Sequence, residues 1–180
     1  MRLEHEFSVP AAPETVWPLL LDVERVAPCL PGAEVAERLD EGTYKVTVTV
    51  ALGPMKLTYR GDVTIAEADP ASMRAVMRAK ATETRGQGTA SATITTTLSP
   101  DGTGTRAAVV SDVQLTGRVA QMGQGIVRDV SNRMLGEFAE CLSQKIAGVE
   151  AAPRAEPRPI RGFSLLWALV RGRLRGLVRR

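Results

Sequence analysis

The spacing of apolar residues along the chain changes from a strand-like to a helix-like period near residue 117. Before that point most segments alternate apolar with polar residues, which is typical of half-buried β-strands. From 118 to 147, apolar residues recur every third or fourth position, which is typical of an amphipathic helix. The pattern therefore predicts a body of strands followed by one long, unbroken helix.

Turn signals rich in Gly and Pro interrupt the alternation and predict seven strands. These strands are expected over residues 3–9, 35–39, 44–52, 56–66, 72–80, 89–98 and 105–116. Between the first two strands, Pro13 and Glu14 favour the start of a helix. Asp22 can cap a second short helix, which is expected to stop at Pro28 and Pro31.

The resulting order is one strand, two helices, six strands and a long helix that Gly148 is suited to end. This order predicts an α+β domain in which the long helix packs against the face of a curved antiparallel sheet. It is the order of the helix-grip (START-like) fold. We expect this domain over residues 1–148, a Pro/Ala-rich extended linker over 149–161 and a separate amphipathic helix over 162–180.

Charge is divided unevenly between the expected domain and the C-terminal segment. Residues 1–150 carry 15 Lys/Arg and 19 Asp/Glu, a net charge of −4, whereas residues 151–180 carry eight Arg and one Glu, a net charge of +7. The acidic domain argues against nucleic acid as a partner of the domain. The basic segment could meet RNA, anionic lipid or an acidic protein.

The last 19 residues combine nine large apolar side chains with five arginines and no acid. Placed on a helix, they form an apolar stripe with arginines beside and opposite it. This pattern favours a helix lying on an anionic membrane surface; docking onto the domain or an acidic partner, or an artefactual or disordered tail, are the alternatives. The membrane-binding candidates are Phe163, Leu166, Trp167, Val170, Arg171, Arg173, Leu174, Arg175, Leu177 and Arg179.

Targeting features and cysteine content favour a cytoplasmic protein. Residues 1–9 contain acids and no apolar signal-peptide core, and the longest apolar run, FSLLWALV, is far shorter than the roughly 20 residues of a spanning helix. The two cysteines, Cys29 and Cys141, are too few for a disulfide framework. We expect peripheral attachment to the cytoplasmic face of the cell membrane.

Three segments carry a resemblance to a known family. They are VWPLLLDVERVAPCLPGAE, GTYKVTVTVALGPMKLTYRGDV, and GRVAQMGQGIV with its later FAECL. Over about residues 1–148 the chain resembles the CoxG family of carbon monoxide dehydrogenase subunits, a branch of the START/polyketide-cyclase (SRPBCC) superfamily. The resemblance implies a role in bringing a CO dehydrogenase-type molybdenum hydroxylase to the membrane. It also implies binding of a quinone, menaquinone or ubiquinone, in the domain's cavity.

Many residues expected to face the long helix are small. Alternation places Met73, Ala75, Met77 and Ala79 on one inner face, and the next two strands contribute Ala90, Ala92, Ile94, Ala107, Val109 and Ser111. Protein interiors pack to a density of about 0.75, so small side chains on a curved sheet can leave a void. The alternative is a sheet that follows the helix more closely.

The ligand-binding candidates come from the first helix, the LPG turn, the inner face of the sheet and the long helix. They are Trp17, Leu30, Tyr59, Met77, Ala90, Ala92, Ser111, Met122, Gly123, Ile126, Val130 and Met134. Methionines suit an adaptable apolar site, although core packing is the alternative for them and for Trp17. Tyr59 could donate a hydrogen bond to a quinone carbonyl, or be a core tyrosine.

Two glycines, Gly123 and Gly125, weaken the start of the long helix by about 1 kcal/mol each relative to Ala. They indicate either close approach of a ligand and a flexible cavity mouth, or tight packing of the helix start on the LPG turn.

Catalytic groups are scarce in the sequence. His5, the only histidine, is expected on the solvent-facing side of the first strand, and the cysteines lack the spacing of metal ligands. Asp62 and Asp112 are expected on the outer face, so no pair of inward carboxylates emerges for acid–base chemistry. Arg118 could contact a polar ligand head or form a surface salt bridge. No metal and no covalent cofactor is expected.

We therefore expect a non-catalytic carrier of a hydrophobic small molecule, most concretely a quinone. It would link a CO dehydrogenase-type molybdenum hydroxylase to an anionic membrane surface and so support electron transfer to the quinone pool. One alternative is an enzyme of the polyketide cyclase/aromatase type, which would need Tyr59, Arg118 and an acid to converge inside the domain. The other is a membrane adaptor without a ligand.

Overall fold

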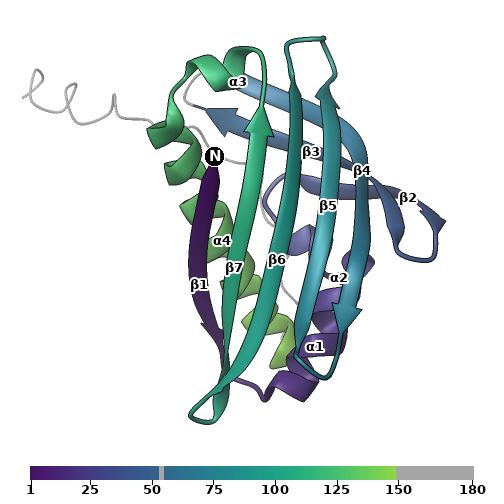
Figure 1. Ribbon diagram of the computed structural model, residues 1–180, viewed down its shortest axis with the longest axis vertical. Helices are drawn as coiled ribbons and strands as arrows, with labels where there is room; N and C mark the ends of the chain where they lie inside the picture. Colours follow the sequence, from purple (N-terminus) through teal and green to yellow (C-terminus); the bar gives the residue numbers. More distant parts are fainter. Residues whose placement is uncertain (53–54, 149–180) are drawn as a thin grey trace, which may run out of the picture.

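The computed structural model describes residues 1–52 and 55–148, in which helices cover one face of a seven-stranded antiparallel sheet (Figure 1). The sheet order is β1-β7-β6-β5-β4-β3-β2. Its strands are β1 (Arg2–Val9), β2 (Ala33–Asp40), β3 (Thr43–Leu52), β4 (Met55–Asp69), β5 (Arg74–Glu83), β6 (Thr89–Asp101) and β7 (Gly104–Leu115). The helices are α1 (Pro13–Leu21), α2 (Val23–Val26), the 3-10 turn η1 (Ala27–Cys29), α3 (Arg118–Gln121) and α4 (Gln124–Ile146).

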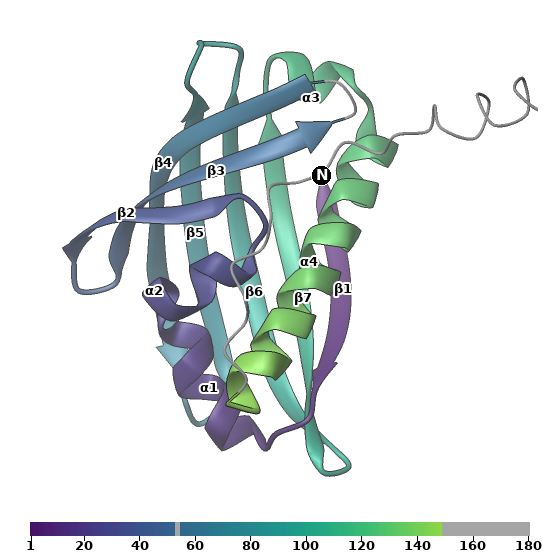
Figure 2. The ribbon, with the colours of Figure 1, turned by 180° about the vertical axis from the view of Figure 1, so that it is seen from behind.

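The observed order of elements confirms the predicted α+β helix-grip fold. Figure 2 shows α4 running obliquely across β1 and β7, with α1 and α2 beside its C-terminal end. Asp22 caps α2 as predicted, since its carboxylate accepts a hydrogen bond from the Arg25 N–H at 3.1 Å. Pro28 does not end the helical stretch but lies within η1, because a proline is compatible with the first turn of a helix.

The seven strands are observed with bounds shifted by up to three residues from the prediction, and the shift of β5 matters most for the inner face. β5 begins at Arg74 and extends to Glu83, whereas the sequence predicted residues 72–80. The start is later because Asp69 closes a turn, with its carboxylate accepting from the Ala71 N–H at 3.0 Å and the Ser72 hydroxyl at 2.6 Å. The three additional residues at the other end bring Glu83 into the sheet.

The predicted unbroken helix after residue 117 is wrong, because the chain breaks between α3 and α4. Gly123 has a φ of 86°, in the left-handed region that favours glycine. A Cβ atom at Gly123 or Gly125 would meet nothing within 4 Å, so tight packing on the LPG turn does not explain these glycines. The backbone at the break requires Gly123, whereas the structure gives no reason for Gly125.

A close backbone approach occurs instead just before α3. Gly117 has a φ of 74°, and a Cβ atom there would overlap the carbonyl oxygen of Gln87. The Arg118 N–H donates to that same carbonyl at 3.1 Å, and the Thr89 N–H donates to the Thr116 hydroxyl at 2.8 Å. These contacts fix the β5–β6 connection to the start of α3.

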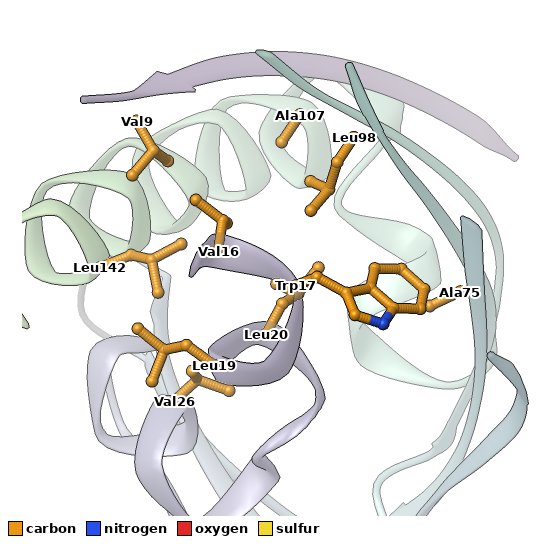
Figure 3. Close-up of a cluster of buried hydrophobic side chains, with 10 residues drawn as sticks. All are labelled: Val9, Val16, Trp17, Leu19, Leu20, Val26, Ala75, Leu98, Ala107 and Leu142. Carbon is orange, nitrogen blue, oxygen red and sulfur yellow. The ribbon is translucent and has the colours of Figure 1, made fainter. Parts of the chain in front are cut away.

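The main hydrophobic core lies where α1 and the last turns of α4 meet the sheet. Figure 3 shows its ten buried residues, Val9, Val16, Trp17, Leu19, Leu20, Val26, Ala75, Leu98, Ala107 and Leu142. The rings of Phe7 and Phe138 pack edge to face beside it, with centroids 6.0 Å apart. Each large buried side chain contributes about 1.5–3 kcal/mol, so this core fixes the C-terminal half of α4 on the sheet.

A disulfide joins the same end of α4 to η1. Cys29 and Cys141 are buried, their Cα atoms lie 5.3 Å apart, and 112 positions separate them in sequence. This bond was not predicted, because two cysteines far apart in sequence carry no local indication of pairing. The disulfide cross-links the segment that leads into β2 with the helix that covers the sheet.

Replacing Gly117 with Ala is expected to destabilise the domain, because the new methyl group would overlap the Gln87 carbonyl and the backbone would be strained. We expect a loss of more than about 1 kcal/mol in the free energy of unfolding. The matched control is Gly125→Ala, which has free space and helical neighbours and should gain up to about 1 kcal/mol. Denaturant unfolding measures both, and equal effects of the two substitutions would contradict this account.

The double variant Cys29→Ala/Cys141→Ala is expected to lose about 2–4 kcal/mol of unfolding free energy under oxidising conditions. The reason is that the bond closes a loop of more than a hundred residues and so restricts the unfolded chain. Wild-type protein kept in reductant is the control and should unfold at nearly the same denaturant concentration as the variant. A variant as stable as the oxidised wild type would show that the bond adds nothing.

Candidate ligand-binding site

The inner face of the sheet is the face that meets the helices, and the predicted assignment of residues to it is confirmed. Ala75, Leu98 and Ala107 belong to the main core. Continuing the alternation along the same strands gives two rows of mostly small inner residues, Gly61–Ala81–Ala90–Leu115 and Val63–Ala79–Ala92–Val113, which lie side by side in the sheet register.

A second buried cluster lies at the other end of the sheet, near α3. It contains Leu52, Leu57, Tyr59 and Val119, and the partly buried residues packed against it are Val50, Ala81, Ala90, Leu115, Met122, Val127 and Val130. Between the two clusters the inner face is only half-buried, at Met77, Ala79, Ala92, Ile94, Ser111 and Val113. Side chains in a continuous core are fully buried, so solvent reaches the inner face in this middle region.

The sheet residues predicted to bind a ligand all lie on this inner face. They are Tyr59, Met77, Ala90, Ala92 and Ser111. The structure therefore brings these five together along one surface that faces the helices.

The helical candidates are more dispersed than those of the sheet. Met122 and Val130 pack against the second cluster, and Met134 is half-buried on α4. Ile126, at the start of α4, is a large apolar residue with 41% of its surface exposed. Gly123 lies at the break between the two helices.

Two candidates belong to the N-terminal helical segment. Trp17 is buried in the main core, and its indole extends toward Ala75 (Figure 3), which agrees with the core interpretation. Leu30 is half-buried and follows η1 directly beside the disulfide-bonded Cys29. A ligand-binding role of the candidates remains a prediction.

One acidic residue on the inner face was missed by the sequence analysis. Glu83 is directly opposite Tyr59 in the β4–β5 register, and only 3% of its surface is exposed. Alternation from Ala75 assigns Glu83 to the inner face, but the predicted strand ended at residue 80. A longer strand would have revealed it.

Hydrogen bonds within the β5–β6 turn hold the Glu83 side chain. Its Oε2 atom accepts from the N–H groups of Arg85 at 2.7 Å and Gln87 at 3.2 Å. Burial raises the pKa of the Glu83 carboxyl, but hydrogen bonds from the backbone N–H groups of Gln87, Arg85 and Thr58 outweigh burial and hold the pKa below its usual value. Burial, and secondly the charge of Glu83, raises the pKa of Tyr59.

His5 lies on the inner side of β1, so its predicted solvent-facing position is wrong. Leu3 and Val9, which share its face by alternation, are buried, and His5 is opposite the buried Val109. Its Nδ1 atom is buried without a hydrogen-bond partner. Glu4 and Glu6, on either side of it in sequence, are exposed on the outer face, and alternation then assigns His5 to the inner one.

Other polar groups have the positions that the sequence predicted. Asp62 and Asp112 are exposed on the outer face, and Arg118 is exposed at the start of α3. Within residues 1–52 and 55–148, no three His, Cys, Asp or Glu side chains gather as a metal site. The acid and the tyrosine of the cyclase hypothesis are thus neighbours, whereas its arginine is exposed.

The membrane-related predictions fall on another part of the chain. The linker at 149–161 and the membrane-binding candidates from Phe163 to Arg179 lie outside the described residues. Among the helices that the structure describes, none has the length and apolarity needed to cross a bilayer.

Solved structures with the same fold come from several bacteria. A conserved protein from Geobacillus kaustophilus has a TM-score of 0.74 at 19% identity, over 82% of this chain and 96% of that one. The Zhui aromatase/cyclase from Streptomyces sp. R1128 has a TM-score of 0.59 at 17% identity, over 84% and 96% of the two chains. A START superfamily protein from Mycobacterium smegmatis has a TM-score of 0.54 at 16% identity, over 82% and 98%.

Comparison at the sequence level is more specific than these structural similarities. No curated protein sequence matches the chain significantly. The family model for CoxG, a carbon monoxide dehydrogenase subunit, matches residues 6–147, which include every element from α1 to α4. The chain therefore belongs to the CoxG family of carbon monoxide dehydrogenase subunits.

Proposed function

We propose that this protein carries a hydrophobic ligand, a quinone, between the membrane and a CO dehydrogenase-type molybdenum hydroxylase. The observation that carries the proposal is the half-buried, small-residue surface between the two buried clusters of the inner face. Membership of the CoxG family and the START-like fold support a hydrophobic-ligand-binding protein associated with CO dehydrogenase.

The chemistry of the inner face suits an elongated apolar ligand. Ala79, Ala81, Ala90 and Ala92 occupy little volume on the inner face, and Met77 and Met134 can adapt to an irregular apolar molecule. Ligand sites in proteins are mostly apolar, with a few polar groups that fix orientation. Tyr59 would supply a hydrogen bond to a quinone carbonyl.

The C-terminal segment supports the membrane half of the proposal. Residues 151–180 carry a net charge of +7, and apolar residues alternate with the arginines at helical spacing. Each arginine close to an anionic leaflet contributes about 1 kcal/mol to binding. On this proposal the segment attaches the domain to the cytoplasmic face, where electrons from the enzyme partner enter the quinone pool.

A second candidate function is cyclase-like catalysis inside the same domain. The observation that favours it is the register pair Tyr59 and Glu83, two polar groups that face the interior, together with the shared fold of an aromatase/cyclase. The non-catalytic role is preferred because Arg118, the third group that the cyclase hypothesis requires, is exposed to solvent.

Protein purified from cells with its native membranes is expected to contain a quinone, measured by organic extraction and mass spectrometry. Ala92→Phe should lower quinone content and affinity at least tenfold, because the ring would fill the half-buried inner face. Thr93→Phe is the matched control, since the neighbouring residue is exposed on the outer face. Wild-type protein that contains no quinone and fails to bind an added one would disprove the carrier function.

Removing residues 150–180 is expected to abolish binding to vesicles that contain anionic lipid, while quinone affinity stays unchanged. The reason is that the deletion removes eight arginines and the apolar stripe but leaves every described strand and helix intact. Sedimentation with vesicles of phosphatidylcholine alone and with added phosphatidylglycerol measures the effect. Undiminished binding by the truncated protein would show that the segment is not the membrane anchor.

A further inference from the structure

Two polar side chains face the interior side by side at the α3 end of the sheet. Tyr59 and Glu83 are direct register partners, and their exposed fractions are 8% and 3%. Side chains directly opposite each other in an antiparallel pair have Cβ atoms about 4.5–5.5 Å apart. The two side chains are therefore neighbours, and Tyr59 also packs in the apolar cluster of Leu52, Leu57 and Val119.

Glu83 keeps unused hydrogen-bonding capacity although its turn already binds it. Both hydrogen bonds from the turn, from the N–H groups of Arg85 and Gln87, go to Oε2. The Thr58 N–H also binds this carboxyl. A carboxylate has about four lone-pair sites on its two oxygens, so one site remains for a further hydrogen bond beside those from Arg85, Gln87 and Thr58. Oε1 is not among the buried side-chain atoms without a partner in the described residues, so a ligand group that donates a hydrogen bond can reach it.

In this pair Glu83 is deprotonated and Tyr59 is protonated. Backbone hydrogen bonds hold the pKa of Glu83 below its usual value, so the side chain is an anion that only accepts. Burial and the charge of Glu83 raise the pKa of Tyr59, so its hydroxyl stays protonated and can donate. Together the two register partners offer one acceptor and one donor on adjacent strands.

We infer that Tyr59 and Glu83 form a recognition site for a hydroxyl group on an apolar ligand. The ligand hydroxyl donates its hydrogen to the Glu83 carboxylate, and its oxygen accepts a hydrogen bond from Tyr59. A carbonyl or ether oxygen satisfies only Tyr59 and turns its lone pairs toward the carboxylate. This inference rests on the proposed ligand binding and adds selectivity, because the dihydroxy form of a quinone then binds more tightly than the oxidised form.

Glu83 thereby has a role beyond the turn, which is to accept a hydrogen bond from a ligand hydroxyl. Val119 and Met122 of the α3 segment pack at this end, so a head group bound to the polar pair would contact them as well. A site built to hydrogen-bond a hydroxyl rejects analogues that lack it, because its buried polar groups are then unpaired. The hydrogen bond from a ligand hydroxyl to the charged Glu83 carboxylate corresponds to binding roughly ten- to a hundredfold tighter than that of an analogue without the hydroxyl.

The test uses the full chain and two probes that differ only in the hydroxyl hydrogen, 2-naphthol and 2-methoxynaphthalene. Fluorescence titration of the wild type should give at least tenfold tighter binding of 2-naphthol. In Glu83→Gln, the amide oxygen can still accept from the turn, while its NH2 group replaces the acceptor that faces the ligand. The preference should fall to within about twofold, with the affinity for the ether unchanged or improved.

Two further variants keep the test decisive. Glu6→Gln, at an exposed position, removes one negative charge elsewhere and should preserve the preference. Tyr59→Phe should lower the affinity for both probes and leave the ratio of the two affinities unchanged. This variant provides the test if Glu83→Gln does not fold. A wild type without preference, a Glu83→Gln protein that keeps it, or a folded Tyr59→Phe protein with unchanged affinities overturns the inference.

A titration of the wild type with a naphthoquinone separates this inference from the proposed function. Failure to bind the quinone and both probes would overturn the carrier function itself. Tight but equal binding of all three compounds would leave the carrier function standing and reject only the recognition of a hydroxyl group.

Discussion

One long helix has to cover the apolar face of seven strands. The rest of the structure depends on the mismatch in width between this helix and the sheet. A helix is about 10 Å wide, whereas neighbouring strands are about 4.8 Å apart, so α4 can cover only a few strands at once. It packs along β1, beside β7, and the central strands β5 and β6 are left with alanines on their inner face. The half-buried surface follows from geometry and from these small residues together.

The two ends of the covering helix are held in different ways. At its C-terminal end, Leu142 lies in the main core, Phe138 packs on Phe7, and Cys141 is bonded to Cys29. At its N-terminal end, the chain breaks at Gly123 and the short α3 lies over the second cluster. In a reducing compartment the cysteines would be thiols. Packing by Leu142 and Phe138 would then hold the anchored end alone, so the bond adds stability without defining the fold.

Sequence patterns predicted what depends on local periodicity and missed what depends on contacts across the fold. Alternation placed Met77, Ala92 and Ser111 on the correct face because a strand has a fixed period of two. The break at Gly123 was invisible because apolar spacing continues across it. The pairing of Cys29 with Cys141 and the overlap that requires Gly117 arise only when distant segments meet. Glu83 was missed through a strand end placed three residues too early.

The uneven charge of the chain gives the proposed membrane attachment a direction. An anionic leaflet attracts the segment with a net charge of +7 and repels the domain, whose net charge is −4 over residues 1–150. These forces decay over about 8 Å at physiological ionic strength, so they act only on groups close to the surface. The segment would therefore hold the protein at the membrane while the acidic domain is repelled toward the solution. That arrangement leaves the domain free to meet an enzyme and an apolar ligand in turn.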